Sequence, residues 1–82
     1  HRSLRWLTMT VLALFALVRH DGAESERWIE ALRDVLFEDP LPEGVNTEAA
    51  RDTHRALEAL HRMDSPARDA GLLALAKRRA LV

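Results

Sequence analysis

An uncharged apolar stretch near the start of the chain is the feature that most constrains its fold. The thirteen residues from Trp6 to Val18 carry no charge, and their only hydroxyl groups are those of Thr8 and Thr10. An amphipathic surface helix shows one apolar stripe, whereas a helix that is apolar all round is buried on several sides. We therefore expect this stretch to form the central helix of the fold.

Three interpretations are open for such a stretch: a core helix, a helix in contact with a membrane, and the remnant of a targeting signal. A membrane-spanning helix needs about 20 apolar residues, which is more than Arg5 and Arg19 enclose. A signal peptide has a basic start and an apolar middle, and Arg2 and Arg5 fit that pattern, but a mature chain does not retain its signal. A core helix explains both the length and the charged flanks, so we favour it and keep membrane contact as an alternative.

Capping residues set the expected ends of this helix within Leu4–Gly22. The hydroxyl of Ser3 is suited to accept hydrogen bonds from the free amides of the first turn. Gly22 is suited to the left-handed conformation that ends a helix, and Arg19 and His20 lie at the negative end of the helix dipole. These signals predict a helix that ends just before Gly22.

A second helix is expected from Glu26 to Phe37, with Ser25 as its N-cap. Its apolar residues fall on one face at about 100° per residue. They are Trp28, Ile29, Leu32, Val35 and Leu36. Because the nearest apolar surface is the first helix, we expect the two helices to form an αα-hairpin.

A third helix is expected over Thr47–Met63, capped by Asn46 or Thr47, after a break at residues 38–46 where two prolines and a glycine exclude helix. A narrow seam of small and apolar residues should face the bundle. It comprises Ala49, Thr53, Ala56, Leu60 and Met63, with Leu57 beside it. The opposite, charged face then directs His54, Glu58 and His61 toward solvent.

Ser65 as N-cap, followed by Pro66, predicts the start of a fourth helix that runs to about Leu81. Its apolar face is expected to contain Leu72, Leu73, Ala76 and Ala80. Four helices and no convincing strand predict an all-α fold, a compact bundle of about four antiparallel helices around a buried first helix. Residues 1–82 should form a single domain.

The composition agrees with this fold class. The chain is 48% hydrophobic and 30% charged, which argues against disorder, and good helix formers dominate it. Eight residues are expected to form the core or an interface. They are Trp6, Met9, Phe15, Trp28, Leu32, Leu36, Leu60 and Leu72.

Composition also restricts the possible chemistry. The chain has no cysteine, so disulfides, thiolate metal sites and cysteine nucleophiles are excluded, which fits a reducing, cytoplasmic setting. The formal net charge is −1 with interspersed signs, which disfavours a nucleic-acid partner. Ser3, Ser25 and Ser65 are explained as caps, and no glycine-rich phosphate loop occurs. We therefore expect a protein that is not an enzyme and needs no cofactor.

A metal site has two weak candidates in the sequence. Asp21, Glu24 and Glu26 form an oxygen-rich turn of the kind that binds Ca²⁺ or Mg²⁺, but the EF-hand pattern would need Glu where Leu32 stands. Glu58-x-x-His61 occurs once, whereas carboxylate-bridged di-metal bundles use two such pairs. A turn with helix capping and a solvated helix face are the favoured interpretations.

An apolar Ala/Leu-rich helix before an Asp-Gly turn, a serine cap and an acidic amphipathic helix is typical of one known family. In this chain the features are Leu12–Val18, Asp21-Gly22, Ser25-Glu26, Ile29 and Leu32. Over Leu12–Leu36 the chain therefore resembles the TerB-like domains, a tellurite-resistance-associated helical family. It departs from their pattern at Glu24, where an apolar residue is usual, and at Trp28, where glutamate is usual. The resemblance implies a stress-linked or partner-binding domain with acidic turns.

The leading expectation is a non-enzymatic module for protein–protein interaction or oligomerisation within a larger assembly. A chain of this length buries only somewhat more than ~60% of its unfolded surface, so four short helices need not cover Trp6, Met9 and Phe15. A protein partner or self-association is therefore expected. The alternatives are a TerB-like stress-associated domain that binds a metal ion at the acidic turn, and a membrane-associated helical protein.

Overall fold

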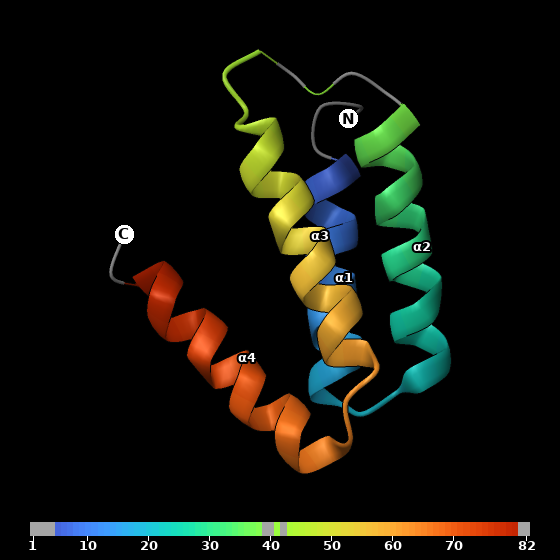
Figure 1. Ribbon diagram of the computed structural model, residues 1–82. Helices are drawn as coiled ribbons and strands as arrows, with labels where there is room; N and C mark the ends of the chain where they lie inside the picture. Colours follow the sequence, from blue (N-terminus) through green and yellow to red (C-terminus); the bar gives the residue numbers. More distant parts are fainter. Residues whose placement is uncertain (1–4, 39–40, 42, 81–82) are drawn as a thin grey trace.

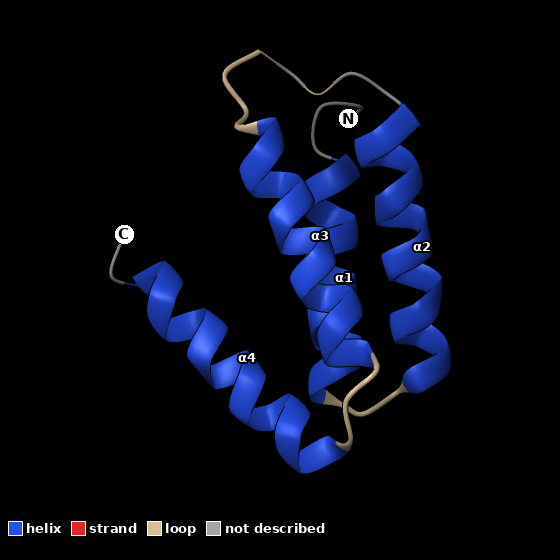
Figure 2. Ribbon diagram, in the orientation of Figure 1, coloured by secondary structure: helices blue, strands red, loops and turns tan. Residues whose placement is uncertain are grey.

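The computed structural model describes residues 5–38, 41 and 43–80, and within these ranges every regular element is an α-helix. The helices are α1 (Arg5–Val18), α2 (Gly22–Glu38), α3 (Thr47–His61) and α4 (Ser65–Ala80). They run alternately up and down, which confirms the all-α antiparallel bundle (Figures 1 and 2). The expected cap Ser3 and the expected helix end at Leu81 lie outside the described residues.

Three helices form the body of the bundle, and the fourth diverges from it. α1 contacts each of the other helices, whereas α4 contacts α1 and α3 alone among the described elements. In Figure 1, α4 meets the body near the 62–64 turn and then slants away toward its C-terminal end. The hairpin of α1 and α2, with α3 packed across it, is therefore the stable frame of the molecule.

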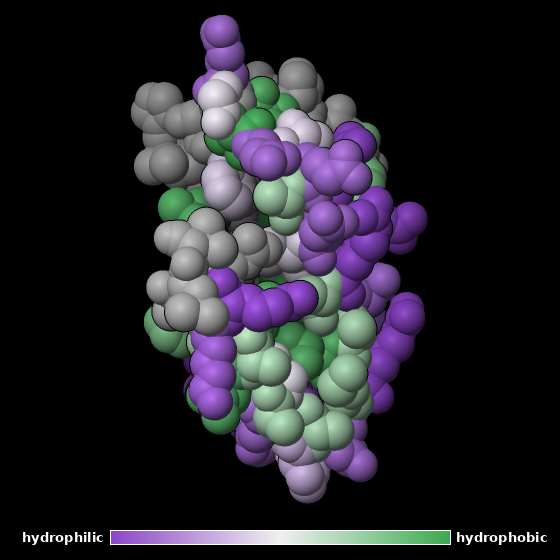
Figure 3. Space-filling view, turned by 60° about the vertical axis from the view of Figure 1, so that its left-hand side comes forward, coloured by the Kyte–Doolittle hydropathy of each residue, from purple (hydrophilic) through white to green (hydrophobic). Residues whose placement is uncertain are grey.

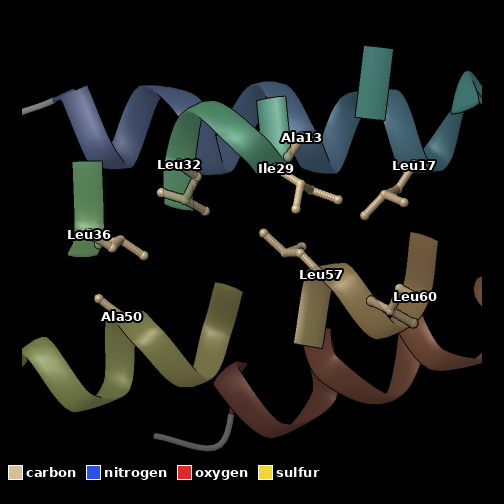
Figure 4. Close-up of a cluster of buried hydrophobic side chains, with 8 residues drawn as sticks. All are labelled: Ala13, Leu17, Ile29, Leu32, Leu36, Ala50, Leu57 and Leu60. Atoms are coloured by element: carbon tan, nitrogen blue, oxygen red, sulfur yellow. The ribbon is translucent and has the colours of Figure 1, made fainter. Parts of the chain in front are cut away.

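The core lies where α1, α2 and α3 face one another (Figure 4). Its buried members are Ala13, Leu17, Ile29, Leu32, Leu36, Ala50, Leu57 and Leu60. Of the expected core residues outside this cluster, Trp6, Met9, Trp28 and Leu72 are partly buried against it, whereas Phe15 is 57% exposed. The expectation that α1 is buried on all sides is therefore too strong, because none of the three helices described beside it covers its outer face.

The turn between α1 and α2 differs from the predicted one. The left-handed residue is His20, with φ of 58°, and not Gly22. The amide of His20 donates to the Leu17 carbonyl at 3.1 Å, and that of Asp21 donates to the Ala16 carbonyl at 2.9 Å, the double bond of a Schellman motif. α2 then begins at Gly22, several residues earlier than predicted.

The N-caps of α2 and α4 are aspartate carboxylates and not the predicted serine hydroxyls. Asp21 accepts a hydrogen bond from the Glu24 amide at 3.1 Å, and Asp64 accepts one from the Ala67 amide at 3.1 Å. Ser25 therefore lies inside the first turns of α2, and the expected cap Ser65 lies one place inside α4. Asp is as good an N-cap as Ser, and in both cases it comes earlier in the chain.

α3 begins at one of its two expected caps but presents a different face to the core. Asn46 accepts from the Ala49 amide at 3.1 Å. The buried residues are Ala50, His54, Leu57 and Leu60. Burial of Leu57 and Leu60 is therefore confirmed, whereas Ala49, Thr53 and Ala56 are only partly buried and Met63 is exposed. In α4, Leu72 and Leu75 face the body, whereas Leu73, expected on the same face, is 57% exposed.

Two contacts hold the base of α4 to α3. A Cβ atom at Gly71 would lie 2.4 Å from Leu60 Cδ2, so the absence of a side chain lets the helices approach closely. The Arg68 guanidinium donates to the carbonyls of Leu60 at 3.1 Å and Met63 at 2.7 Å. It thereby brings a positive charge to the carbonyls at the C-terminal end of α3, where the helix dipole is negative.

Candidate interaction surface

The outer face of α1 carries a row of exposed apolar side chains. Leu7, Val11, Phe15 and Val18 are all between 40% and 61% exposed. They recur at intervals of three and four residues, so they lie on one side of the helix. Single exposed apolar residues are normal, but a contiguous exposed row marks an interaction site.

Three residues of the row, together with the partly buried Leu14, follow the pattern of a helix–helix seam. Leu7, Val11, Leu14 and Val18 are spaced 4, 3 and 4, which places leucine at successive d positions and valine at successive a positions of a heptad. Leu14 is partly buried against the core, so it belongs both to the core and to this seam. We call these four residues the α1 seam.

A groove borders the α1 seam on one side, in the space that the slant of α4 leaves open. It has a volume of about 390 Å³ and is lined by side chains of α1, α3 and α4. Its lining residues are Trp6, Thr10, Leu14, Thr53, Leu72, Leu75 and Ala76. In Figure 3, which looks onto the α4 side, hydrophobic residues gather over the lower centre of the face and hydrophilic ones over its right side.

The groove is apolar although two threonines line it. The hydroxyl of Thr10 donates to the Trp6 carbonyl at 2.8 Å, and that of Thr53 donates to the Ala49 carbonyl at 2.9 Å. Because each hydroxyl proton is used within its own helix, neither is available as a donor to an occupant of the groove. The groove therefore suits an apolar side chain.

Two histidines expected at the solvated face of α3 instead join it to α2. His54 is 4% exposed, and its Nε2 donates to the Ile29 carbonyl at 3.2 Å. His61 Nδ1 lies 2.7 Å from the hydroxyl of buried Ser25. That hydroxyl also lies 3.1 Å from the Gly22 carbonyl, and both bonds form when Ser25 donates to Gly22 and accepts from Nδ1–H. The predicted solvent exposure of His54 is thus wrong, because hydrogen bonding permits its burial.

A second hollow, of about 480 Å³, lies over the buried His54 between α2 and α3. Arg33, Phe37, Arg55 and Glu58 complete its lining. The His54 ring meets Phe37 edge-on at a centroid distance of 5.8 Å. Arg51 lies 4.9 Å over the Phe37 ring, with its buried Nε atom unbonded among the described residues. Arg55 pairs with Asp52, so the hollow is a solvated, charge-balanced surface.

The acidic side chains of the turn that was a candidate metal site make contacts within the described part of the chain instead. Asp21 caps α2. Glu24 accepts from Trp28 Nε1 at 3.0 Å and lies 3.6 Å from the Arg27 guanidinium, while Glu26 is exposed. No group of three or more His, Asp or Glu side chains among the described residues is placed to hold a metal ion.

Comparison with known proteins found no match to this chain among protein families, curated proteins or solved structures. Among the described helices, none is long and apolar enough to cross a membrane. The surface chemistry of the molecule itself is therefore the basis for a functional proposal.

The α1 seam was detectable in the sequence, although the prediction assigned its residues to the core. The 4-3-4 spacing of Leu7, Val11, Leu14 and Val18 is a heptad signal within an otherwise apolar helix. Because neighbouring positions such as Ala13 and Leu17 are also apolar, the spacing could not show which face is covered by the chain itself.

Proposed function

We propose that this protein is a helical module that self-associates through the α1 seam. The observation that carries the proposal is the exposed row on α1, which includes Val11, Phe15 and Val18. A two-fold dimer uses the same patch on both copies, so the patch must fit itself. An uncharged leucine–valine seam meets that requirement, because no like charges oppose each other within it.

A protein partner fits this face better than a lipid surface. Helices that lie in a membrane interface carry a strongly charged face rich in Lys and Arg opposite their apolar face. The opposite face of α1 is instead part of the protein core, with Ala13, Ala16 and Leu17 buried. The TerB-like resemblance supports the same class of function, a partner-binding domain without enzymatic chemistry.

Sedimentation equilibrium at several protein concentrations tests the proposal. We expect a dimer for the unchanged chain, a monomer for Val11→Lys, and a dimer for the control Leu73→Lys. Leu73 is a large exposed apolar residue on α4, so the control adds the same charge away from the seam. A monomer at every concentration for the unchanged chain, or equal behaviour of both variants, would overturn the proposal; quantitative flotation of that monomer with liposomes would point to a membrane instead.

A further inference from the structure

We infer that the two copies pair their α1 helices in parallel, and that Phe15 of each copy enters the groove of the other. This inference rests on the proposed self-association through the α1 seam. The inference specifies in addition the direction in which the two α1 helices pair, and it names two features that fit together, the protruding Phe15 ring and the apolar groove.

The residue types in the seam favour the parallel direction. In parallel two-stranded coiled coils, β-branched residues are preferred at a positions and leucine at d positions. The seam has valine at both a positions, Val11 and Val18, and leucine at both d positions, Leu7 and Leu14. In parallel pairing each residue meets its own copy, which gives two leucine layers and two valine layers.

Parallel pairing also places Phe15 at the groove. Phe15 directly follows Leu14 and is therefore an e position, and Thr10 directly precedes Val11 and is a g position. In a parallel pair, side chains at g of one helix lie beside those at e of the next heptad of the partner helix. Thr10 lines the groove, so the Phe15 ring of the second copy lies at the edge of the groove.

The groove matches the ring in chemistry. Phe15 is 57% exposed in the single chain, and burying an aromatic side chain removes up to 150–250 Å² of surface. The groove presents Trp6, Leu14 and Leu75, and an aromatic ring beside Trp6 gains an additional ring–ring contact. Two-fold symmetry makes this contact twice in each dimer.

Antiparallel pairing is the structural alternative, and it predicts different neighbours. Opposed helices would set Leu7 against Val18 and Val11 against Leu14 of the second copy. In that arrangement e positions approach e positions, so Phe15 would lie near Thr8 and away from the groove. The direction of the helices therefore decides whether the groove is occupied.

Disulfide trapping distinguishes the two directions, because the chain has no cysteine of its own. Under mild oxidation we expect Leu7→Cys to give a covalent dimer, since two Leu7 positions face each other in the parallel pair. Leu73→Cys is the control for random collisions. If Leu7→Cys stays monomeric while the double variant Leu7→Cys/Val18→Cys is trapped, pairing is antiparallel and the inference is wrong, although the proposed self-association stands.

A pair of alanines on α4 tests occupancy of the groove. Ala76 lines the groove and Ala74 does not, and both are exposed, so neither substitution disturbs the core. We expect Ala76→Glu to weaken dimerisation at least about tenfold, because it places a carboxylate beside the inserted ring, and Ala74→Glu to leave it unchanged. Equal dimerisation of the two variants would overturn the insertion of Phe15.

Discussion

The burial of residues in α1 and in α3 is the opposite of what the composition of each helix suggests. α1 carries no charge between Trp6 and Val18, yet Phe15 and Val18 are 57% and 61% exposed. α3 is rich in charged residues, yet it buries His54 to 4% exposure at the centre of its contact with α2. The more apolar helix thus keeps more apolar surface in water.

The reversal follows from how many neighbours each helix has and what they offer. Within the described residues, the helices that contact α1 lie on its inner side, and none lies over its outer side. α3 packs across the hairpin, and His54 is buried there because the Ile29 carbonyl accepts its proton. Burial is therefore decided by available partners, and apolar residues left without any become candidates for contact with another molecule.

The largest effect is expected from two adjacent residues of α1 that differ sharply in burial. Leu17 is 1% exposed and belongs to the core, whereas its neighbour Val18 is 61% exposed. Leu17→Ala should lower the free energy of unfolding by about 2–5 kcal/mol, because it removes buried methyl groups and leaves a cavity. Val18→Ala should change it by less than about 0.5 kcal/mol.

Urea unfolding followed by circular dichroism measures both values. The measurement is made at a protein concentration where the chain is a monomer, because association stabilises the folded state. Equal losses for the two variants would show that α1 is enclosed on all sides, and the contrast between its faces would be wrong.

His54 is the corresponding test on α3. His54→Ala should cost about 2–3 kcal/mol of unfolding free energy, since it leaves a cavity beside Phe37 and removes a hydrogen bond. His54→Phe keeps the ring and removes only the bond to the Ile29 carbonyl, so we expect a loss of about 1 kcal/mol. Thermal unfolding of both variants separates packing from hydrogen bonding, and an unchanged stability for His54→Ala would mean that the ring is not part of the core.

The sequence predicted the number, type and order of the helices because capping residues, prolines and helical periodicity are local signals. It misplaced helix starts by choosing Ser25 and Ser65 where Asp21 and Asp64 do the capping. Two good caps close together cannot be ranked from propensity alone, and helix boundaries shift accordingly.

The faces of the helices were harder to predict because they depend on tertiary partners. In α3, the predicted face avoids His54 because a histidine is read as polar, whereas the observed face buries it, because the Ile29 carbonyl accepts a hydrogen bond from its ring. For α1 the short chain indicated incomplete cover of Trp6, Met9 and Phe15, but only Phe15 of these is exposed, so the sequence did not show which face lacks a neighbour. The groove depends on the slant of α4, which no local signal encodes.

A smaller effect is expected where the α3 histidine meets buried Ser25. Ser25→Ala removes the hydroxyl that bonds both His61 Nδ1 and the Gly22 carbonyl. Because His61 is only partly buried, water replaces part of the lost interaction, and we expect a loss of about 1 kcal/mol. Chemical denaturation gives the value, and Ser65→Ala, at a position without such a bond to another helix in the described structure, is its matched control.

The smallest effect is expected on the outer face of α3, which is the polar counterpart of the α1 seam. Glu58 Oε1 lies 3.9 Å from an Arg62 guanidinium nitrogen, with the arginine side chain 73% exposed. Solvent screens such a pair, and exposed i,i+4 ion pairs contribute about 0.3–0.5 kcal/mol. Glu58→Gln should therefore change stability by no more than that amount, and it should leave the dimer measured by sedimentation intact because it lies away from the α1 seam. If this variant no longer dimerised, the interface would involve the polar outer face of α3 and not the apolar α1 seam, and the contrast between the two surfaces would be wrong.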